Sequence, residues 1–446
     1  MNKSMLNSLR KSIPESIGSK LYSKHFSLPN FTLNTFYQSY SSEIKDFFLE
    51  IYNKKEVADK LEALLSGEEV NYSEGRSALH HYYRNKNHTK YGFDLVKAVD
   101  NLQKKIVKEK YENVFIFGIG GSYEGPKLLL ESLFINKRDK IFFITGPDKD
   151  EFNTIVKPRL IRKNLYIFAS KSFTTDETML TFSWLPKRLK RKHFIAITAN
   201  PSAAEEKHFL KDNIITFPES IGGRYSVWSP ISSAVLDKNS AASFLKGARA
   251  IDHSIKMNKT ALKAIQEIVF YDLWSHNFLK KGNRVVLTYN WKLRSLSNYL
   301  QQLEMESLGK QPSNSDFKKT GQTIYGGFGS TAQHSYFQLL HQGTSDTVAD
   351  IVHAKSSSSK LLNAQAEGQA KLLAGKIKYN NGPDATNGNI PVNFFALNAI
   401  NAETLGSLIA FWEYRVFITA SMLGINPFDQ FGVNAGKKLT QKILKK

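Results

Sequence analysis

The sequence predicts an α/β protein with two domains, each a parallel sheet covered by helices on both faces. Short apolar runs alternate with helix-like segments along most of the chain, and this alternation pauses and resumes in the second half. Alternating strands and helices are typical of parallel sheets in three-layer domains. A chain of 446 residues also exceeds what one hydrophobic core usually serves, so two large domains are expected.

The alternation begins near residue 101, after a stretch with a different pattern. In EIKDFFLEIYNKKEVADKLEALL, from Glu43, apolar residues recur at helical spacing. From Val114 an apolar run leads into glycines and a helix start, and a second round begins at Arg284. We therefore expect five segments: a helical N-terminal segment (1–100), a first α/β domain (101–240), a helical connection (241–280), a second α/β domain (281–425) and a C-terminal segment carrying a lysine motif (426–446).

The composition is strongly basic. The 61 lysines and arginines exceed the 40 acidic residues, giving a formal charge of +21, and positive potential speeds encounter with phosphates. The basic run 187–192 lacks the interleaved aromatics of a nucleic-acid platform, so we interpret it as solvated surface and expect no nucleic-acid partner. No apolar run is long enough to span a bilayer, so we expect no membrane segment.

The residue inventory restricts the chemistry. The chain has no cysteine, which removes disulfides, thiolate metal sites and cysteine nucleophiles. No His, Asp and Glu cluster has metal-ligand spacing, so we expect no metal. Residues 1–20 carry three bases before Glu15, a weak similarity to a transit peptide, but we favour an amphipathic opening helix in a cytoplasmic protein.

Two loops between a strand and a helix are suited to a phosphate group. In the first, Gly121 permits close backbone approach and Ser122 can donate a hydrogen bond, at a place where helix N-termini attract anions. Tyr123 stands where a dinucleotide-binding motif needs glycine. The second loop gathers one cation and several hydroxyls: Ser170, Lys171, Ser172 and Thr175. Helix capping by a threonine explains part of that set equally well.

One helix carries a candidate general base. Gln302 and Glu306 lie one turn apart beside a stripe of leucines, where partial burial raises the pKa of a carboxylate toward the range useful in proton transfer. The alternative is a surface glutamate paired with Lys310, four residues on. The helix alone favours this alternative.

Three further residues stand near glycines or in turns. Arg224 follows paired glycines, Lys437 follows a turn with Gly436, and His334 precedes an apolar helix. His334 by itself is as compatible with a structural role as with a catalytic one.

These segments, in this order, resemble the phosphoglucose isomerase family. The resemblance spans most of the chain and rests on Asn71–Arg76, the GIGGS loop ending at Ser122, SKSFTTDET from Ser170, GGRYSVWS from Gly222, QQLEMESLGK from Gln301, QHSYFQLLHQGT from Gln333 and FDQFGVNAGKKL from Phe428. It implies two sugar-isomerase domains, a homodimer, no metal or organic cofactor, and interconversion of glucose 6-phosphate and fructose 6-phosphate in glycolysis and gluconeogenesis.

The resemblance also implies roles for single residues. Glu306 is similar to the family's proton-transfer glutamate, which works through a cis-enediolate, and Arg224 to the arginine that stabilises the developing charge. His334, supplied by the neighbouring subunit, would open the sugar ring with Lys437 at the ring oxygen. The phosphate and the sugar would be held by Gly121, Ser122, Ser170, Lys171, Ser172, Thr175, Gln302 and Gln430.

Several positions depart from the family pattern. Tyr123-Glu124 replaces Asp-Leu, Leu308 replaces an asparagine, and Gly327-Phe328 replaces Glu-Pro. These changes keep open an alternative, a catalytically impaired module that binds sugar phosphates on the same scaffold. They also leave open the turnover rate and the pH optimum, and the sequence does not decide whether mannose 6-phosphate is a second substrate.

Overall fold

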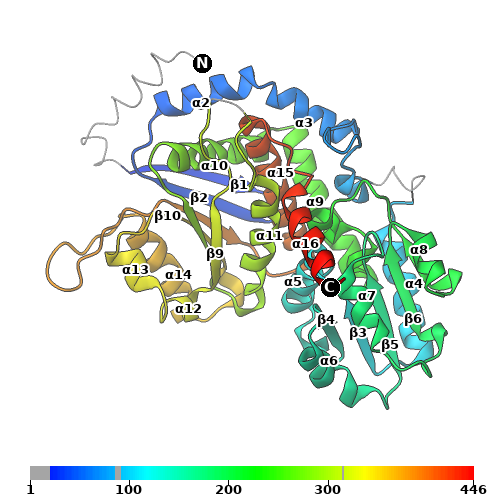
Figure 1. Cartoon of the computed structure of the whole chain (residues 1–446). Coiled ribbons are helices and arrows are strands. Elements are labelled where there is room, and N and C mark those ends of the chain that lie inside the picture. Colours follow the sequence, from blue (N-terminus) through cyan, green and yellow to red (C-terminus); the bar gives the residue numbers. More distant parts are fainter. Residues whose placement is uncertain (1–20, 86–91, 314–315, 446) are drawn as a thin grey trace.

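The computed structural model describes residues 21–85, 92–313 and 316–445, and it contains two β-sheets (Figure 1). The prediction of an α/β protein with parallel sheets and covering helices is confirmed. The five-stranded sheet is parallel throughout, in the order β4 (Ile141–Ile144), β3 (Asn113–Phe117), β5 (Asn164–Ala169), β6 (Phe194–Thr198) and β7 (Ile214–Thr216).

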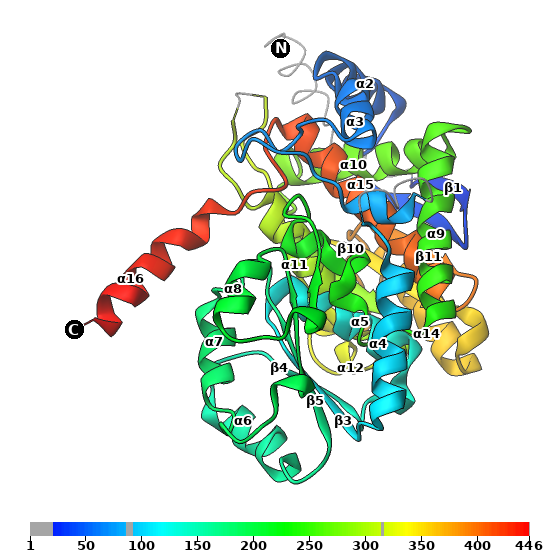
Figure 2. The same cartoon turned by 90° about the vertical axis from the view of Figure 1, so that its right-hand side faces the viewer.

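Alternate side chains of the five-stranded sheet enter two different cores. Val114 and Ile116 of β3 face the main core, whereas Phe115 and Phe117 face a second, aromatic core. The period of two along a strand produces this division, and it explains why the strand reads as one continuous apolar run. The main-core face is covered by α4 (Leu95–Glu109) and α5 (Glu124–Leu133), and the other face by α6 (Lys149–Ile155), α7 (Asp176–Ser183) and α8 (Pro201–Glu206) (Figure 2).

The six-stranded sheet corrects one prediction. Its order is β1 (Tyr22–Leu28), β2 (Phe31–Tyr37), β11 (Val392–Leu397), β10 (Thr347–Ala354), β8 (Asn283–Thr288) and β9 (Thr323–Phe328). β1 and β2 form an antiparallel hairpin that pairs with β11, so the expected all-helical segment 1–100 is wrong at residues 22–37. The heptapeptide FTLNTFY alternates buried and half-buried positions, which is the period of a strand and not of a helix.

Helices cover both faces of this second sheet as well. Val285 and Leu287 of β8 pack toward α12 (Gly329–Ala332), α13 (Phe337–Gln342) and α14 (Lys360–Leu373). Val286, between them, faces the main core with α10 (Thr260–Asn277), α11 (Leu296–Leu308) and α15 (Ala402–Leu423). The other α-helices of the described residues are α2 (Ser42–Lys54), α3 (Val57–Ser66), α9 (Lys238–Lys256) and α16 (Asn434–Leu444).

The helices predicted at 43–65 and within 241–280 are present as α2, α3, α9 and α10. The boundaries of the two domains stay a prediction, and the expected opening helix in residues 1–20 lies outside the described residues. Within the described part of the chain, no helix combines the length and apolarity needed to cross a membrane.

Candidate active site

The first predicted phosphate loop lies directly against the arginine segment and the glutamate helix. It forms a short turn, η4 (Gly120–Ser122), after the carboxyl end of β3, where ligands collect in open parallel sheets. A Cβ atom on Gly121 would lie 1.8 Å from the carbonyl oxygen of Gly223, so this contact requires glycine. A Cβ on Gly120, whose φ is +59°, would lie 3.1 Å from Nε2 of Gln302.

Arg224 is buried and held by hydrogen bonds on every nitrogen. Its Nε donates to Oγ of Ser307 at 2.7 Å, and Nη1 donates to Oε1 of Gln430 at 3.1 Å. Nη2 donates to the carbonyl oxygens of Pro427 at 2.6 Å and Asp429 at 2.8 Å. Since the guanidinium group is planar and its donors are fixed in direction, these acceptors set both its position and its plane.

Glu306 faces Arg224 from the side of α11 that also carries Gln302. Its Oε2 accepts a hydrogen bond from Nε2 of Gln302 at 3.1 Å and lies 3.6 Å from Nη1 of Arg224. The side chain is 24% exposed, so a substrate can reach it. Gln302 and Glu306 therefore lie one turn apart on the same side of α11, as predicted.

Instead of the surface ion pair with Glu306 considered above, Lys310 binds carbonyl groups at the end of α11. Its Nζ donates to the carbonyl oxygens of Glu306 at 3.1 Å and Ser307 at 2.7 Å, and lies 3.5 Å from Oδ1 of Asp429. A cation that caps the last carbonyls of a helix also interacts favourably with the helix dipole. Burial, together with Arg224, lowers the pKa of Lys310 to about 8.

The second loop connects β5 to α7 and brings its hydroxyl groups together. Oγ of Ser170 lies 2.9 Å from Oγ1 of Thr175, and Oγ1 of Thr174 donates to Oγ of Ser172 at 2.9 Å. Thr175 occupies the N-cap position of α7, yet its side chain makes no capping hydrogen bond. The capping alternative therefore does not account for Thr175, whose hydroxyl stays within the loop.

Lys171 supplies the positive charge of this second loop. It is partly buried, and burial, with Arg76 acting in the same direction, lowers its pKa to about 8; Glu219 and Glu74 oppose the shift. Arg224 also contributes to the lowering, which places the two cations within electrostatic reach. Lys171 thus adds a positive charge near Arg76 and Arg224, with the carboxylates of Glu74 and Glu219 close by.

Comparison with known proteins decides the family. The family model for phosphoglucose isomerase matches residues 36–446. The chain belongs to the phosphoglucose isomerase family. The glucose-6-phosphate isomerase of Legionella pneumophila (strain Paris) is 32% identical over 91% of this chain and 87% of its own length. That of Novosphingobium aromaticivorans is 32% identical over 90% of this chain and 85% of its own length.

Two solved structures share the fold. The crystal structure of a glucose-6-phosphate isomerase from Chlamydia trachomatis matches with a TM-score of 0.84 at 24% identity, covering 99% of this chain and 95% of that one. A hypothetical protein from Thermus thermophilus matches with a TM-score of 0.73 at 22% identity, covering 95% of this chain and 100% of that one.

The acceptors of Arg224 are held by a network of hydrogen bonds that the sequence did not indicate. Oδ2 of Asp429 accepts a hydrogen bond from Oγ of Ser73 at 2.6 Å. Nδ2 of Asn426 donates to Oδ1 of Asn71 at 2.8 Å and to Oγ of Ser73 at 2.6 Å. The motif Asn71–Arg76, singled out only for its resemblance to the isomerase family, therefore holds the segment whose carbonyl groups orient Arg224.

His334 and Lys437 are not brought to Glu306 within this chain. His334 follows α12 and is exposed, and Lys437 is exposed on α16, which projects from the body of the molecule (Figure 2). In α16, Nε2 of Gln441 donates to Oδ2 of Asp176 at the start of α7. Across the described ranges, no hydrogen bond or ion pair connects His334 or Lys437 with Glu306 or Arg224.

The residues that depart from the isomerase family pattern lie around this site without interrupting it. Tyr123 packs edge-on against Phe143, and Leu308 is buried in the main core at the end of α11. Gly327 and Phe328 are the last two residues of β9. In the part of the chain that the structure describes, no group of three or more His, Asp and Glu side chains is arranged to hold a metal ion.

Proposed function

We propose that this protein is a glucose-6-phosphate isomerase that interconverts glucose 6-phosphate and fructose 6-phosphate. The observation that carries the proposal is the carboxylate of Glu306, 3.6 Å from the buried guanidinium of Arg224, on a helix whose Gln302 lies beside Gly120 of the first loop. Membership of the phosphoglucose isomerase family and relatives that bear this enzyme name support it. The impaired-module alternative has no such support.

The proposed mechanism assigns one step to each group. Hydroxyl and N–H groups of the two loops, with Lys171, bind the phosphate: Gly121, Ser122, Ser170, Ser172 and Thr175. Glu306 removes the proton from C2 of the open-chain aldose and returns it to C1, so that the carbonyl group moves from C1 to C2. Arg224 stabilises the negative charge of the cis-enediolate formed between these two transfers. Gln302 and Gln430 line the sugar.

We further propose a cytoplasmic homodimer in which His334 of one subunit reaches the site of the other. In support, His334 is exposed and lies outside the contacts made by Glu306 and Arg224. Lys437 would act with it at the ring oxygen during ring opening. The exposed apolar residues Leu439 and Ile443 of α16 are consistent with a helix that contacts a second chain.

The first experiment is a coupled assay for glucose 6-phosphate formed from fructose 6-phosphate in the presence of a chelator. We expect full turnover, because every proposed group is a side chain or backbone group of the protein. Binding of fructose 6-phosphate without any turnover would contradict the proposal and favour the impaired module.

A subunit-mixing experiment tests the placement of His334. Glu306→Gln and His334→Gln subunits, each inactive alone, are mixed and allowed to exchange. If a site combines Glu306 of one chain with His334 of the other, each hybrid dimer regains one intact site, and the mixture recovers about a quarter of wild-type activity. No recovery in hybrids verified by native mass spectrometry would contradict the shared site.

A further inference from the structure

The helix that carries Glu306 has a second, buried attachment on its opposite side. Glu304 lies midway between Gln302 and Glu306, and two residues correspond to about 200° of rotation around an α-helix. Glu304 is only 5% exposed, so it points into the core while the other two point toward the loops. One helix therefore has a face with the proposed proton-transfer group and a face fixed by a buried charge.

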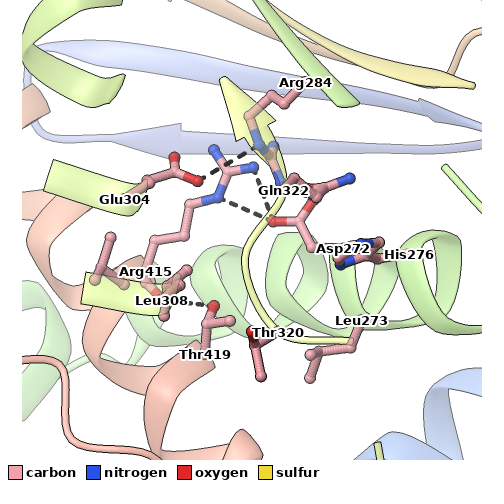
Figure 3. Close-up of a pocket in the computed structure, with 11 residues that line it drawn as sticks. Asp272, Leu273, His276, Arg284, Glu304, Leu308, Thr320, Gln322, Arg415 and Thr419 are labelled. Atoms are coloured by element: carbon pink, nitrogen blue, oxygen red, sulfur yellow. Dashed lines mark hydrogen bonds and ion pairs between the residues drawn. The ribbon is translucent and has the colours of Figure 1, made fainter. Parts of the chain in front are cut away.

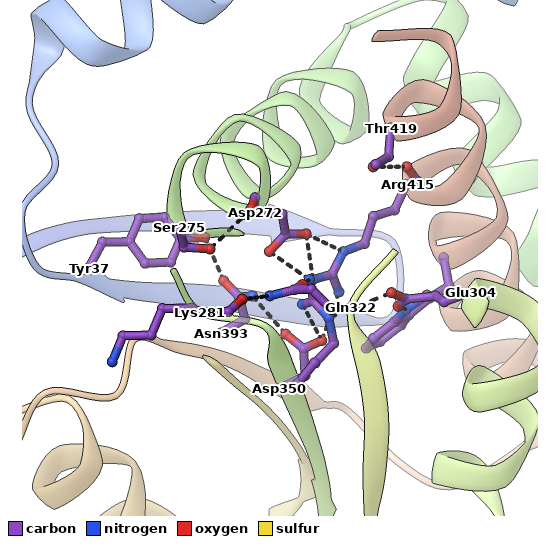
Figure 4. A network of polar contacts seen from close by, with 12 residues as sticks. Tyr37, Asp272, Ser275, Lys281, Glu304, Gln322, Asp350, Asn393, Arg415 and Thr419 are labelled. Atoms are coloured by element: carbon purple, nitrogen blue, oxygen red, sulfur yellow. Dashed lines mark hydrogen bonds and ion pairs between the residues drawn. The ribbon is translucent and has the colours of Figure 1, made fainter. Parts of the chain in front are cut away.

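Glu304 belongs to a cluster of buried charges that joins α11 to four other elements (Figure 4). Its Oε1 accepts a hydrogen bond from Nε1 of Trp412 on α15 at 2.6 Å, and its Oε2 lies 3.5 Å from Nε of Arg284 on β8. Arg284 in turn lies 2.8 Å from Asp272 of α10 and 2.9 Å from Asp350 of β10.

Arg415 of α15 completes the charge cluster. It lies 2.8 Å from Asp272 and 2.9 Å from Asp350, so both arginines contact the same two aspartates. The same helix α15 ends at Leu423, just before the segment whose carbonyl groups orient Arg224. The cluster is thus attached both to the helix of Glu306 and to the helix that leads into the acceptors of Arg224.

The charges in this cluster do not balance. It contains three carboxylates (Asp272, Glu304, Asp350) and two guanidinium groups (Arg284, Arg415), all less than a tenth exposed. A buried charge without a partner costs several kcal/mol, so the excess carboxylate is most stable when it binds a proton. Since the three carboxylates share their partners, that proton belongs to the cluster and not to one residue.

Within the described residues, no lysine forms an ion pair with the three carboxylates: Nζ of Lys281 donates to the carbonyl oxygen of Asn389, and Lys319 lies within electrostatic reach of His276. His276 lies one turn after Asp272 on the same helix, α10. Burial lowers the pKa of His276 to about 4, so this histidine is neutral. Tyr37 of β2 donates to Asn393 of β11, and burial keeps its pKa well above the usual value. Asn393 and Gln322, which contact Asp350 and Arg284, are uncharged amides.

The pKa values of Asp350 and Glu304 are raised, as the excess of carboxylates over guanidinium groups predicts. Burial raises the pKa of Asp350 to about 7 against the opposing Arg284, and Asp272 and Glu304 add to the rise. Burial likewise raises the pKa of Glu304, again opposed by Arg284.

The cavity beside the cluster is too small to be a substrate site. It measures about 20 Å³, close to the space of one water molecule, and Glu304, Leu308, His276 and Gln322 are among its lining residues (Figure 3). Leu308, one of the departures from the family pattern, therefore closes this space with an apolar side chain. The relation of the cluster to the site is therefore structural.

We propose that Glu304 is a positioning residue for Glu306, and that the buried cluster of Asp272, Arg284, Glu304, Asp350 and Arg415 holds α11 in place while it carries one shared proton. This inference rests on the proposed isomerase function for its effect on catalysis. When the proton is lost, the cluster has an uncompensated negative charge two residues from Glu306. The helix shifts to relieve it, and proton transfer slows.

The test compares the pH dependence of kcat and KM in Glu304→Gln, Glu304→Ala and wild type. Glu304→Gln keeps an acceptor for Trp412 and leaves two carboxylates for two guanidinium groups, so no shared proton is needed. Glu367→Gln, at an exposed ion pair of α14 with Lys355, is the matched control and should follow wild type.

Between about pH 6 and 9 we expect wild-type kcat to fall as the shared proton is lost, and Glu304→Gln to lose most of this fall while its KM profile stays that of wild type. Glu304→Ala should lower kcat about tenfold or more at every pH with little change in KM, because the phosphate loops are untouched. Superimposable kcat profiles for wild type and Glu304→Gln would overturn the inference.

A second readout does not depend on activity. A carboxylate with a raised folded-state pKa contributes stability that is complete below its unfolded pKa and is lost as the pH rises through the folded value. The urea midpoint of wild type should therefore drop more between about pH 5.5 and 8.5 than that of Glu304→Gln. Parallel midpoints would refute the shared proton. Wild type without turnover would refute the isomerase function alone, and the urea comparison would still decide on the cluster.

Discussion

Substitution of Gly121 by alanine tests whether the first phosphate loop and the Arg224 segment form one site. The added Cβ would lie 1.8 Å from the carbonyl oxygen of Gly223, and ordinary contact begins at 3.4 Å, so the two backbones must separate by about 1.6 Å. Displacements of about 1 Å in a site can reduce the rate 10²-fold. We therefore expect kcat/KM to fall about 100-fold or more, equivalent to about 2.7 kcal/mol of transition-state stabilisation.

The assay follows glucose 6-phosphate formation by coupled kinetics, alongside urea unfolding. Overpacking of this kind typically costs about 1–3 kcal/mol of stability, which leaves the protein folded at the assay temperature. Gly368→Ala on α14 adds the same methyl group where no atom lies within 4 Å, and should keep wild-type turnover. Turnover of Gly121→Ala within about threefold of wild type would refute the close approach of the two segments.

Three further outcomes are expected. Burial lowers the pKa of Lys171 to about 8, so its charge is lost as the pH rises through that value, and KM for fructose 6-phosphate should rise above about pH 8 in wild type but not in Lys171→Gln. Arg224→Lys should lower kcat about 10²- to 10³-fold in the coupled assay, because one ammonium group cannot keep the acceptors that orient the guanidinium. Arg415→Met should lower the free energy of unfolding in urea by about 3–5 kcal/mol, because Asp272 and Asp350 would each lose a buried partner.

The sequence was sufficient to predict how Gln302 and Glu306 lie relative to each other. Helical periodicity placed Gln302 and Glu306 one turn apart on the same side, and the structure has them 3.1 Å apart. The glycines of the first loop were predicted to let the backbone approach a phosphate group; what the structure shows is a close approach of Gly121 to the carbonyl group of Gly223. The position of Gln302 relative to Glu306 is short-range geometry, which spacing along the chain determines, whereas Gly121 and Gly223 are far apart in the sequence.

Long-range partners could not be read in the same way. Nothing in the local pattern around Arg224 indicates that its acceptors come from Pro427 and Asp429, more than 200 residues later. The pairing of β2 with β11 joins segments from opposite ends of the chain. Such contacts depend on topology, and a short strand before a helical stretch is easily assigned to the helices that follow.

The buried charge cluster escaped the sequence analysis for a related reason. Glu304 stands between two residues of the site motif, and its type alone suggests a solvated surface position. Only the packing of α11 against β8 and α15 shows that this glutamate points inward, toward Arg284 and Trp412.

We propose that Glu306 moves the proton between C2 and C1. The most direct measurement is kcat of Glu306→Gln in the coupled assay at the pH of maximal wild-type activity. The glutamine keeps the size of the side chain and its contact with Gln302 but cannot accept the proton, so we expect a loss of about 10³-fold or more with KM little changed. Turnover by Glu306→Gln within about tenfold of wild type would show that another group moves the proton.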